Sequence, residues 1–142
     1  MTARRIPIQK YMTETKAFAS PEESVLSAYR RMVEHDIRHL PVLAGEDLVG
    51  VLFKSDLKLV ESLADDVVQP VRVKAMMVTE LYTVSPEEAI DVAAREMSRR
   101  KYGSALVVSH GKVIGVFTTS DGLRALSDAL TDSLPESMRF GT

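Results

Sequence analysis

Hydrophobic and polar positions along the chain form an ordered series of short patterns. The first places apolar residues at helical spacing and predicts an amphipathic helix with one buried face: Val25, Ala28, Tyr29, Met32 and Val33. Two apolar runs follow at 40–43 and 48–53, and the turn residues at 45–47 between them predict a β-hairpin. An extended piece at 16–19 precedes the helix, and a short helix at 57–63 follows the hairpin. The pattern therefore predicts a β-α-β-β-α unit.

The same series returns 65 residues later, because residues 8–57 align with residues 73–122 without a gap. The second unit predicts an extended piece at 81–84, a hairpin of 105–108 and 113–118, and a short helix at 123–130. A unit of about 60 residues buries too little surface to be stable alone, so we expect the two sheets to pack together. The predicted fold class is α+β, of α/β type, with two repeats related by pseudo-two-fold symmetry.

Local signals set the expected boundaries of these elements. Ser-Pro-Glu-Glu occurs at 20–23 and 85–88 and predicts a capping box, with serine as the N-cap of each long helix. Ser55-Asp56 and Ser120-Asp121 predict caps for the two short helices. Gly50 and Gly115 fall inside strands, where a missing side chain often marks close approach of another group.

The repeat also predicts how the chain is divided into domains. We expect a first domain at 8–64, a linker at 65–72 and a second domain at 73–130. Residues 131–142 show no periodicity and predict a loosely ordered tail.

Composition narrows the possible functions. The net charge is −2, so no basic field attracts nucleic acid or an anionic membrane, and nucleic-acid binding is disfavoured. The chain has no cysteine, which excludes a thiolate metal site and a cysteine nucleophile, and we expect no metal. The sequence contains no stretch of 18 apolar residues, and no apolar leader follows its first residues. We therefore expect a cytoplasmic protein. Phosphate-loop, nucleophile-elbow and zinc-protease motifs are missing, so we expect no enzyme and no catalytic cofactor.

The chain resembles a tandem pair of CBS (cystathionine β-synthase) domains, also called a Bateman module. The resemblance rests on Met12-Thr13, the repeated Ser-Pro-Glu-Glu, the segment 37–42 and the segment 115–121, in that order. It implies an adenosine-containing ligand: AMP, ADP or ATP, and less often S-adenosylmethionine, NAD or a cyclic dinucleotide. It also implies regulation of a partner and a homodimer that forms a four-domain disc.

The resemblance further implies two ligand sites, each shared between the repeats. The main site would combine the second repeat's Gly-x-x-Thr-x-Ser-Asp frame with basic residues of the first repeat: Val116, Thr118, Ser120, Asp121, Lys16, Ala17, Ile37, Arg38 and His39. A carboxylate can accept both hydroxyls of a ribose, and a helix N-terminus favours an anion. Phe53 replaces the hydroxyl residue in the other frame, so we expect a weaker or empty second site at Ser55, Asp56, Tyr82, Gly103 and Ser104.

Two alternatives stay open on the sequence. Helix capping alone explains Asp56 and Asp121 without a ligand. The whole chain is also compatible with a structural or oligomerisation module whose clefts hold no ligand. Arg38 and His39 favour a phosphorylated ligand over S-adenosylmethionine. The sequence does not identify the nucleotide or its number of phosphates. It also does not identify the partner or distinguish a parallel from an antiparallel dimer.

Overall fold

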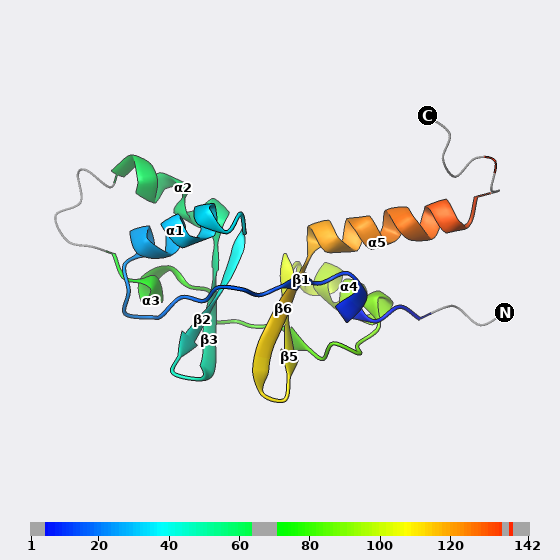
Figure 1. Ribbon diagram of the computed structural model, residues 1–142, viewed down its shortest axis with the longest axis horizontal. Helices are drawn as coiled ribbons and strands as arrows, with labels where there is room; N and C mark the ends of the chain where they lie inside the picture. Colours follow the sequence, from blue (N-terminus) through cyan, green and yellow to red (C-terminus); the bar gives the residue numbers. More distant parts are fainter. Residues whose placement is uncertain (1–4, 64–70, 135–136, 138–142) are drawn as a thin grey trace.

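The computed structural model of the protein describes residues 5–63, 71–134 and 137 (Figure 1). The first repeat contains these elements: η1 (Ile8–Lys10), β1 (Thr13–Glu14), α1 (Val25–Glu34), β2 (His39–Ala44), β3 (Asp47–Phe53) and α2 (Lys54–Leu63). The second repeat contains these elements: α3 (Val73–Met76), β4 (Thr83–Val84), α4 (Ile90–Arg100), β5 (Ser104–Ser109), β6 (Lys112–Thr118) and α5 (Thr119–Asp132). The two repeats lie side by side with their hairpins adjacent at the centre (Figure 1).

Both predicted hairpins are confirmed. β2 pairs antiparallel with β3, and β5 pairs antiparallel with β6, with a register shift at the equivalent place in each hairpin. The second sheet has the order β1-β6-β5-β4, while the first sheet contains β2-β3. In the first sheet, single bridges take the place of the two outer strands. The bridge Ala19↔Val42 corresponds to the pairing of β4 with β5, and Val51↔Val78 corresponds to the pairing of β1 with β6. The pairing pattern therefore repeats with the 65-residue offset seen in the sequence, as pseudo-two-fold symmetry requires.

Two connecting segments cross between the repeats. The N-terminal segment, residues 6–14, lies against the second repeat: β1 pairs with β6, and Ile8 is fully buried in the second core. The equivalent segment, residues 71–78, lies against the first repeat, where Val73 is fully buried and Val78 bridges Val51. Residues 73–78 thus belong to the second repeat in sequence but help to complete the core of the first. Residues 64–70 of the predicted linker lie outside the described residues.

The predicted capping boxes at 20–23 and 85–88 are wrong. Residues 20–23 form a turn, in which Glu23 N donates to Ser20 O at 3.3 Å, and α1 starts later with Ser24 as its N-cap. α4 likewise starts at Ile90, after Ala89. The cause is tertiary: the crossing segments accept the first helical N–H groups, as Val25 N donates to Val71 O and Ile90 N to Ile6 O. Proline is equally favoured at the second position of such a turn.

The short helices also begin earlier than predicted. α2 starts at Lys54 and α5 at Thr119, so Ser55 and Ser120 lie within the first turn rather than at the N-cap. The N-cap of α5 is Thr118, and its capping box is completed by Asp121. α5 runs to Asp132, two residues into the predicted tail. Most of that tail lies outside the described residues.

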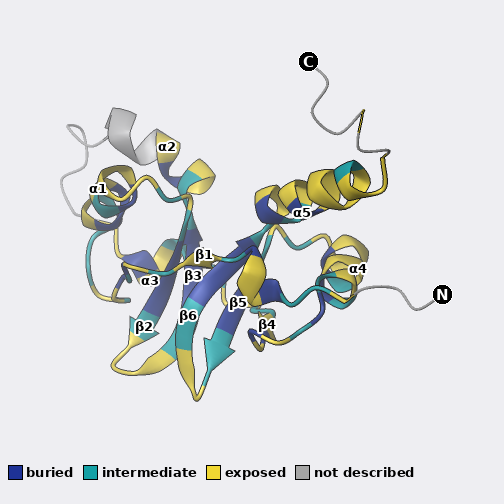
Figure 2. Cartoon of the chain, turned by 45° about the vertical axis from the view of Figure 1, so that its right-hand side comes forward, coloured by how far each residue is buried: buried dark blue, intermediate teal, exposed yellow. Residues whose placement is uncertain are grey.

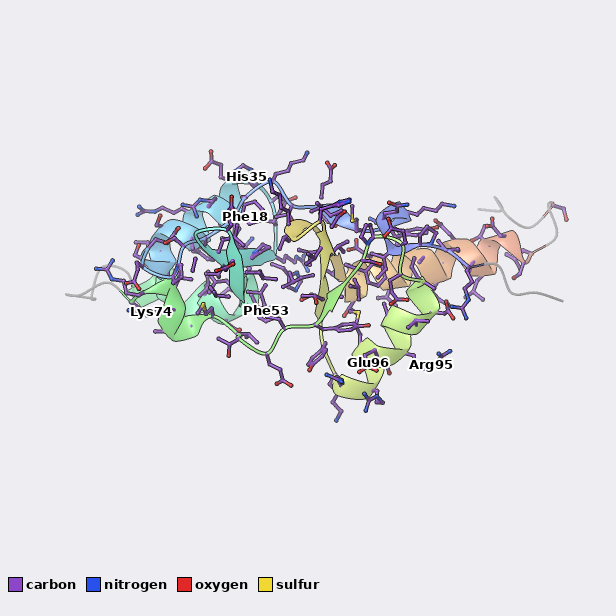
Figure 3. All side chains as sticks on the ribbon, turned by 90° about the horizontal axis from the view of Figure 1, so that it is seen from below. Phe18, His35, Phe53, Lys74, Arg95 and Glu96 are labelled. Atoms are coloured by element: carbon purple, nitrogen blue, oxygen red, sulfur yellow. The ribbon has the colours of Figure 1, made fainter. Side chains whose placement is uncertain are left out.

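Hydrophobic cores fill each repeat and the interface between their sheets. Each of the four hairpin strands contains a run of buried residues, whereas α5 exposes most of its length (Figure 2). A third cluster joins the two sheets through Val51 of β3, Leu106 of β5 and Val116 of β6. Phe53 is partly buried against this cluster and lies towards the middle of the molecule (Figure 3). The predicted packing of the two sheets against each other is therefore confirmed.

Candidate functional site

A cavity of about 590 Å³ lies between the repeats at the N-terminus of α5. The first repeat lines it with predicted residues Lys16, Ile37, Arg38 and His39, and the second with Val116, Thr118, Ser120 and Asp121. Ala17 is the exception, because it is buried in the core of the first repeat and does not line the cavity. The structure thus brings the main-site residues from both repeats together, as the sequence analysis expected.

Asp121 is the buried polar residue at the centre of this wall, with 3% of its surface exposed. Its Oδ2 accepts the Thr118 backbone N–H at 2.9 Å and the Thr118 hydroxyl at 3.1 Å. Arg124 Nη2 donates to Oδ1 at 3.2 Å, and Thr13 Oγ1 lies 3.3 Å from the same oxygen. Capping therefore holds the carboxylate in place, and the long contact from Thr13 leaves it able to accept from a ligand hydroxyl.

Three nitrogen-bearing side chains face the carboxylate across the cavity. Lys16 and Arg38 are exposed, and His39 is partly buried with its ring edge-to-face on Phe53, at 5.1 Å between centroids. Burial lowers the pKa of the His39 imidazole below its ordinary value; the Asp121 carboxylate opposes this shift and Arg38 adds to it. The imidazole is therefore neutral at pH 7, and the permanent positive charges on this wall come from Lys16 and Arg38.

One cavity residue has an unused hydrogen-bonding group. Thr15 lines the cavity, and its Oγ1 is buried without a hydrogen-bond partner among the described residues. A buried hydroxyl without a partner costs about 1–3 kcal/mol relative to a satisfied one.

The predicted second site is smaller and is only partly assembled. A cavity of about 290 Å³ is lined by Tyr82, Gly103 and Ser104, together with Phe53. Ser55 and Asp56 do not line it, and both are exposed on α2. The second cavity therefore lacks an equivalent of Asp121, and its charged lining residues are Glu80, Arg100 and Lys101.

Sequence reasoning missed eight residues of the main site. Arg124 pairs with Asp121, and the other seven line the cavity: Thr13, Glu14, Thr15, Asp36, Thr119, Leu123 and Gly103, the last of which was predicted for the second site. Their signal was proximity along the chain, since 13–15 directly precede Lys16 and Asp36 directly precedes Ile37. Arg124 lies one helical turn after Asp121, where an i,i+3 ion pair is expected.

Two further observations concern the described part of the chain. None of its helices is long and apolar enough to cross a membrane. It also contains no cluster of His, Asp or Glu side chains suited to holding a metal ion.

Together, fold and cavity define a two-repeat α+β protein with a polar ligand cavity shared between its repeats. The chain belongs to the CBS domain family, which it matches at residues 8–61 and 73–128. Over 103 residues it is 38% identical to an inosine-5'-monophosphate dehydrogenase of Korarchaeum cryptofilum, covering 72% of this chain and 20% of that protein. It spans less than half the length of the curated relatives that it matches first.

Solved structures show the same arrangement of two CBS domains. An uncharacterized conserved protein from Pyrococcus horikoshii is 28% identical, with a TM-score of 0.71 and coverage of 88% of this chain and 95% of that one. CBSX2, solved in complex with AMP, is 25% identical, with a TM-score of 0.70 and coverage of 87% and 98%. The enzyme similarity is confined to the CBS region within a larger protein.

Proposed function

We propose that this CBS pair is a non-catalytic regulatory module that binds an adenosine nucleotide in the cavity between its repeats. Asp121 would accept the ribose hydroxyls, while Lys16 and Arg38 would face the phosphate. Ser120 lines the cavity and would donate its hydroxyl to the ligand, whereas the Thr118 hydroxyl already donates to Asp121 and would act on a ligand as an acceptor. Occupancy would then be passed to a partner protein by a change in the shape or association of the module.

The observation that carries this proposal is the buried Asp121 carboxylate opposite two exposed bases. The carboxylate is 3% exposed and is held by Thr118 and Arg124, so it is a fixed acceptor for a ligand hydroxyl that displaces the long contact from Thr13. CBSX2 in complex with AMP supplies a related example of an adenosine nucleotide bound by a protein of this fold.

The test is a thermal-shift panel of AMP, ADP, ATP, S-adenosylmethionine and NAD. A ligand at 100 times its dissociation constant adds roughly 2.7 kcal/mol to the native state, so we expect one adenosine nucleotide to raise the melting temperature by several degrees. Guanosine monophosphate serves as the control for the base. If the whole panel leaves the melting temperature unchanged, the nucleotide-sensing proposal fails and the oligomerisation module takes its place.

The same module is proposed to act as a homodimer through α4 and α5. A groove of about 880 Å³ runs between these helices, lined largely by apolar and small residues that include Ala94, Ala125 and Ala129. Leu123 and Leu126 of α5 line this groove and are 61% and 53% exposed, and Leu130 further along α5 is 59% exposed. Two identical copies can bury such a face against each other across a two-fold axis. Exposed apolar surface of this kind marks an association site.

Replacing Leu126 with glutamate should separate the copies. We expect the wild type to sediment as a dimer and Leu126→Glu as a monomer, because the substitution places a charge in an apolar interface. Val33→Glu is the matched control, since Val33 is 51% exposed on α1, away from this groove. Analytical ultracentrifugation distinguishes the outcomes, and a monomeric wild type or a dimeric Leu126→Glu contradicts the interface.

A further inference from the structure

The main cavity carries acidic as well as basic side chains, and this mixture bears on which nucleotide it takes. Lys16 and Arg38 line it, and so do Glu14 and Asp36. Each base follows an acid by two residues, in Glu14-Thr15-Lys16 and in Asp36-Ile37-Arg38. All four residues are exposed.

The remaining charges of the site compensate one another. Asp121 forms an ion pair with Arg124 at 3.2 Å, so the central carboxylate is already balanced. The ion pairs found within residues 5–63 and 71–134 include none between Lys16, Arg38, Glu14 and Asp36. Two positive and two negative side chains are therefore left to act on whatever enters the cavity.

This balance limits how much negative charge a ligand can bring. A phosphate monoester carries −1.5 to −2 at neutral pH, which two cationic side chains can match. A diphosphate or triphosphate adds negative charge that meets no further cation of the cavity wall and lies beside two carboxylates. Like charges placed together at a binding site are unfavourable and act mainly as a device of specificity.

The segment that carries Glu14 and Lys16 runs antiparallel to β6, the strand that leads into Thr118 and Asp121. Thr13 pairs with Val116, and Glu14 pairs with Gly115. A ligand held by Thr118 and Asp121 would therefore share one cavity with this acid and this base.

We propose that the cavity selects a nucleoside monophosphate over the di- and triphosphate, and that Glu14 and Asp36 are the residues that set this limit. The inference rests on the proposed function, because it concerns the ligand of the same cavity. Glu14 and Asp36 act by repulsion on the second and third phosphate groups, while Lys16 and Arg38 hold the first.

The experiment measures AMP, ADP and ATP affinities by isothermal titration calorimetry without divalent cations. The variant Glu14→Gln/Asp36→Asn removes both acids; asparagine suits position 36, whose φ of 52° favours Asn or Asp among non-glycine residues. The control Glu46→Gln/Asp47→Asn makes the same change of net charge in the β2–β3 turn, away from the cavity. Raising the salt concentration should weaken the discrimination, because exposed charges are screened.

We expect the wild type to bind AMP about tenfold or more tightly than ATP, with ADP between them. Removing both acids should narrow the AMP-to-ATP ratio by about three- to tenfold through tighter ATP binding, and the control should leave the ratio within about twofold. Equal or tighter binding of ATP by the wild type overturns the proposal, as does an unchanged ratio in Glu14→Gln/Asp36→Asn. Binding of none of the three nucleotides overturns the proposed function itself, and the selectivity with it.

Discussion

Replacing Asp121 with alanine should abolish nucleotide-dependent stabilisation and lower the free energy of unfolding by about 1–3 kcal/mol. The carboxylate completes the capping box of α5 and accepts the Thr118 N–H at 2.9 Å. Its removal leaves that N–H without its partner and breaks the ion pair with Arg124, which keeps its hydrogen bond to the carbonyl oxygen of Tyr11. The same carboxylate is the proposed acceptor of the ribose hydroxyls, so stability and binding fall together.

Matched variants separate these two effects. Asp56 occupies the equivalent position of the first repeat but is exposed, so Asp56→Ala should change the unfolding free energy by less than about 0.5 kcal/mol and leave binding intact. Asp121→Asn keeps the shape and one acceptor oxygen, and should lose more binding than stability. Chemical denaturation and calorimetry measure the two quantities. Nucleotide binding that survives Asp121→Ala but disappears in Asp56→Ala would reverse the assignment of the two sites.

Gly115→Ala should destabilise the protein by about 1–3 kcal/mol, whereas Gly50→Ala should cost less than about 1 kcal/mol. A Cβ at Gly115 would lie 2.7 Å from Met12 Sδ and 3.0 Å from the carbonyl oxygen of Thr13. At Gly50 the close atoms all belong to the Met77 side chain, with the nearest also at 2.7 Å. A methionine side chain can move aside, but a paired backbone carbonyl cannot do so without shifting β1.

Gly115→Ala should also affect nucleotide binding more than Gly50→Ala does. β1 carries Thr13 and Glu14, which line the main cavity, so Gly115→Ala should also weaken nucleotide binding. Thermal melts of both variants with and without AMP test the pair. Equal destabilisation by the two alanines would show that the carbonyl contact of the N-terminal segment is not what makes Gly115 necessary.

The sequence predicted the repeat and both hairpins, because periodicity and the duplicated motif are local and repeated; the residues that meet at the main cavity were predicted from the resemblance to CBS domain pairs. Close approach at Gly50 and Gly115 was also predicted, and Met77 and Met12 are the groups that approach. These features depend on residue type and spacing along a single stretch of chain.

The features that sequence reasoning got wrong depend on contacts between distant segments. Ser20-Pro21 favours a turn and a helix start about equally. The turn forms because the backbone of residues 71–73 bonds to Val25 N and Glu23 O. Ser120 looked like the N-cap, but Thr118 holds that place because β6 runs directly into α5. The acids Glu14 and Asp36 are unremarkable in the sequence and become informative only once they line the same cavity as Asp121.

The crossing of residues 6–14 and 71–78 has a consequence for what happens when the chain is incomplete. Each crossing segment covers the outer side of a strand in the opposite repeat: β1 covers β6, and Val78 covers β3. A fragment that contains one repeat would expose that strand's backbone N–H and C=O groups, which invites pairing with other chains. Partial products of this chain are therefore expected to aggregate, and a mutation that shortens either crossing segment harms the repeat that it does not belong to in sequence.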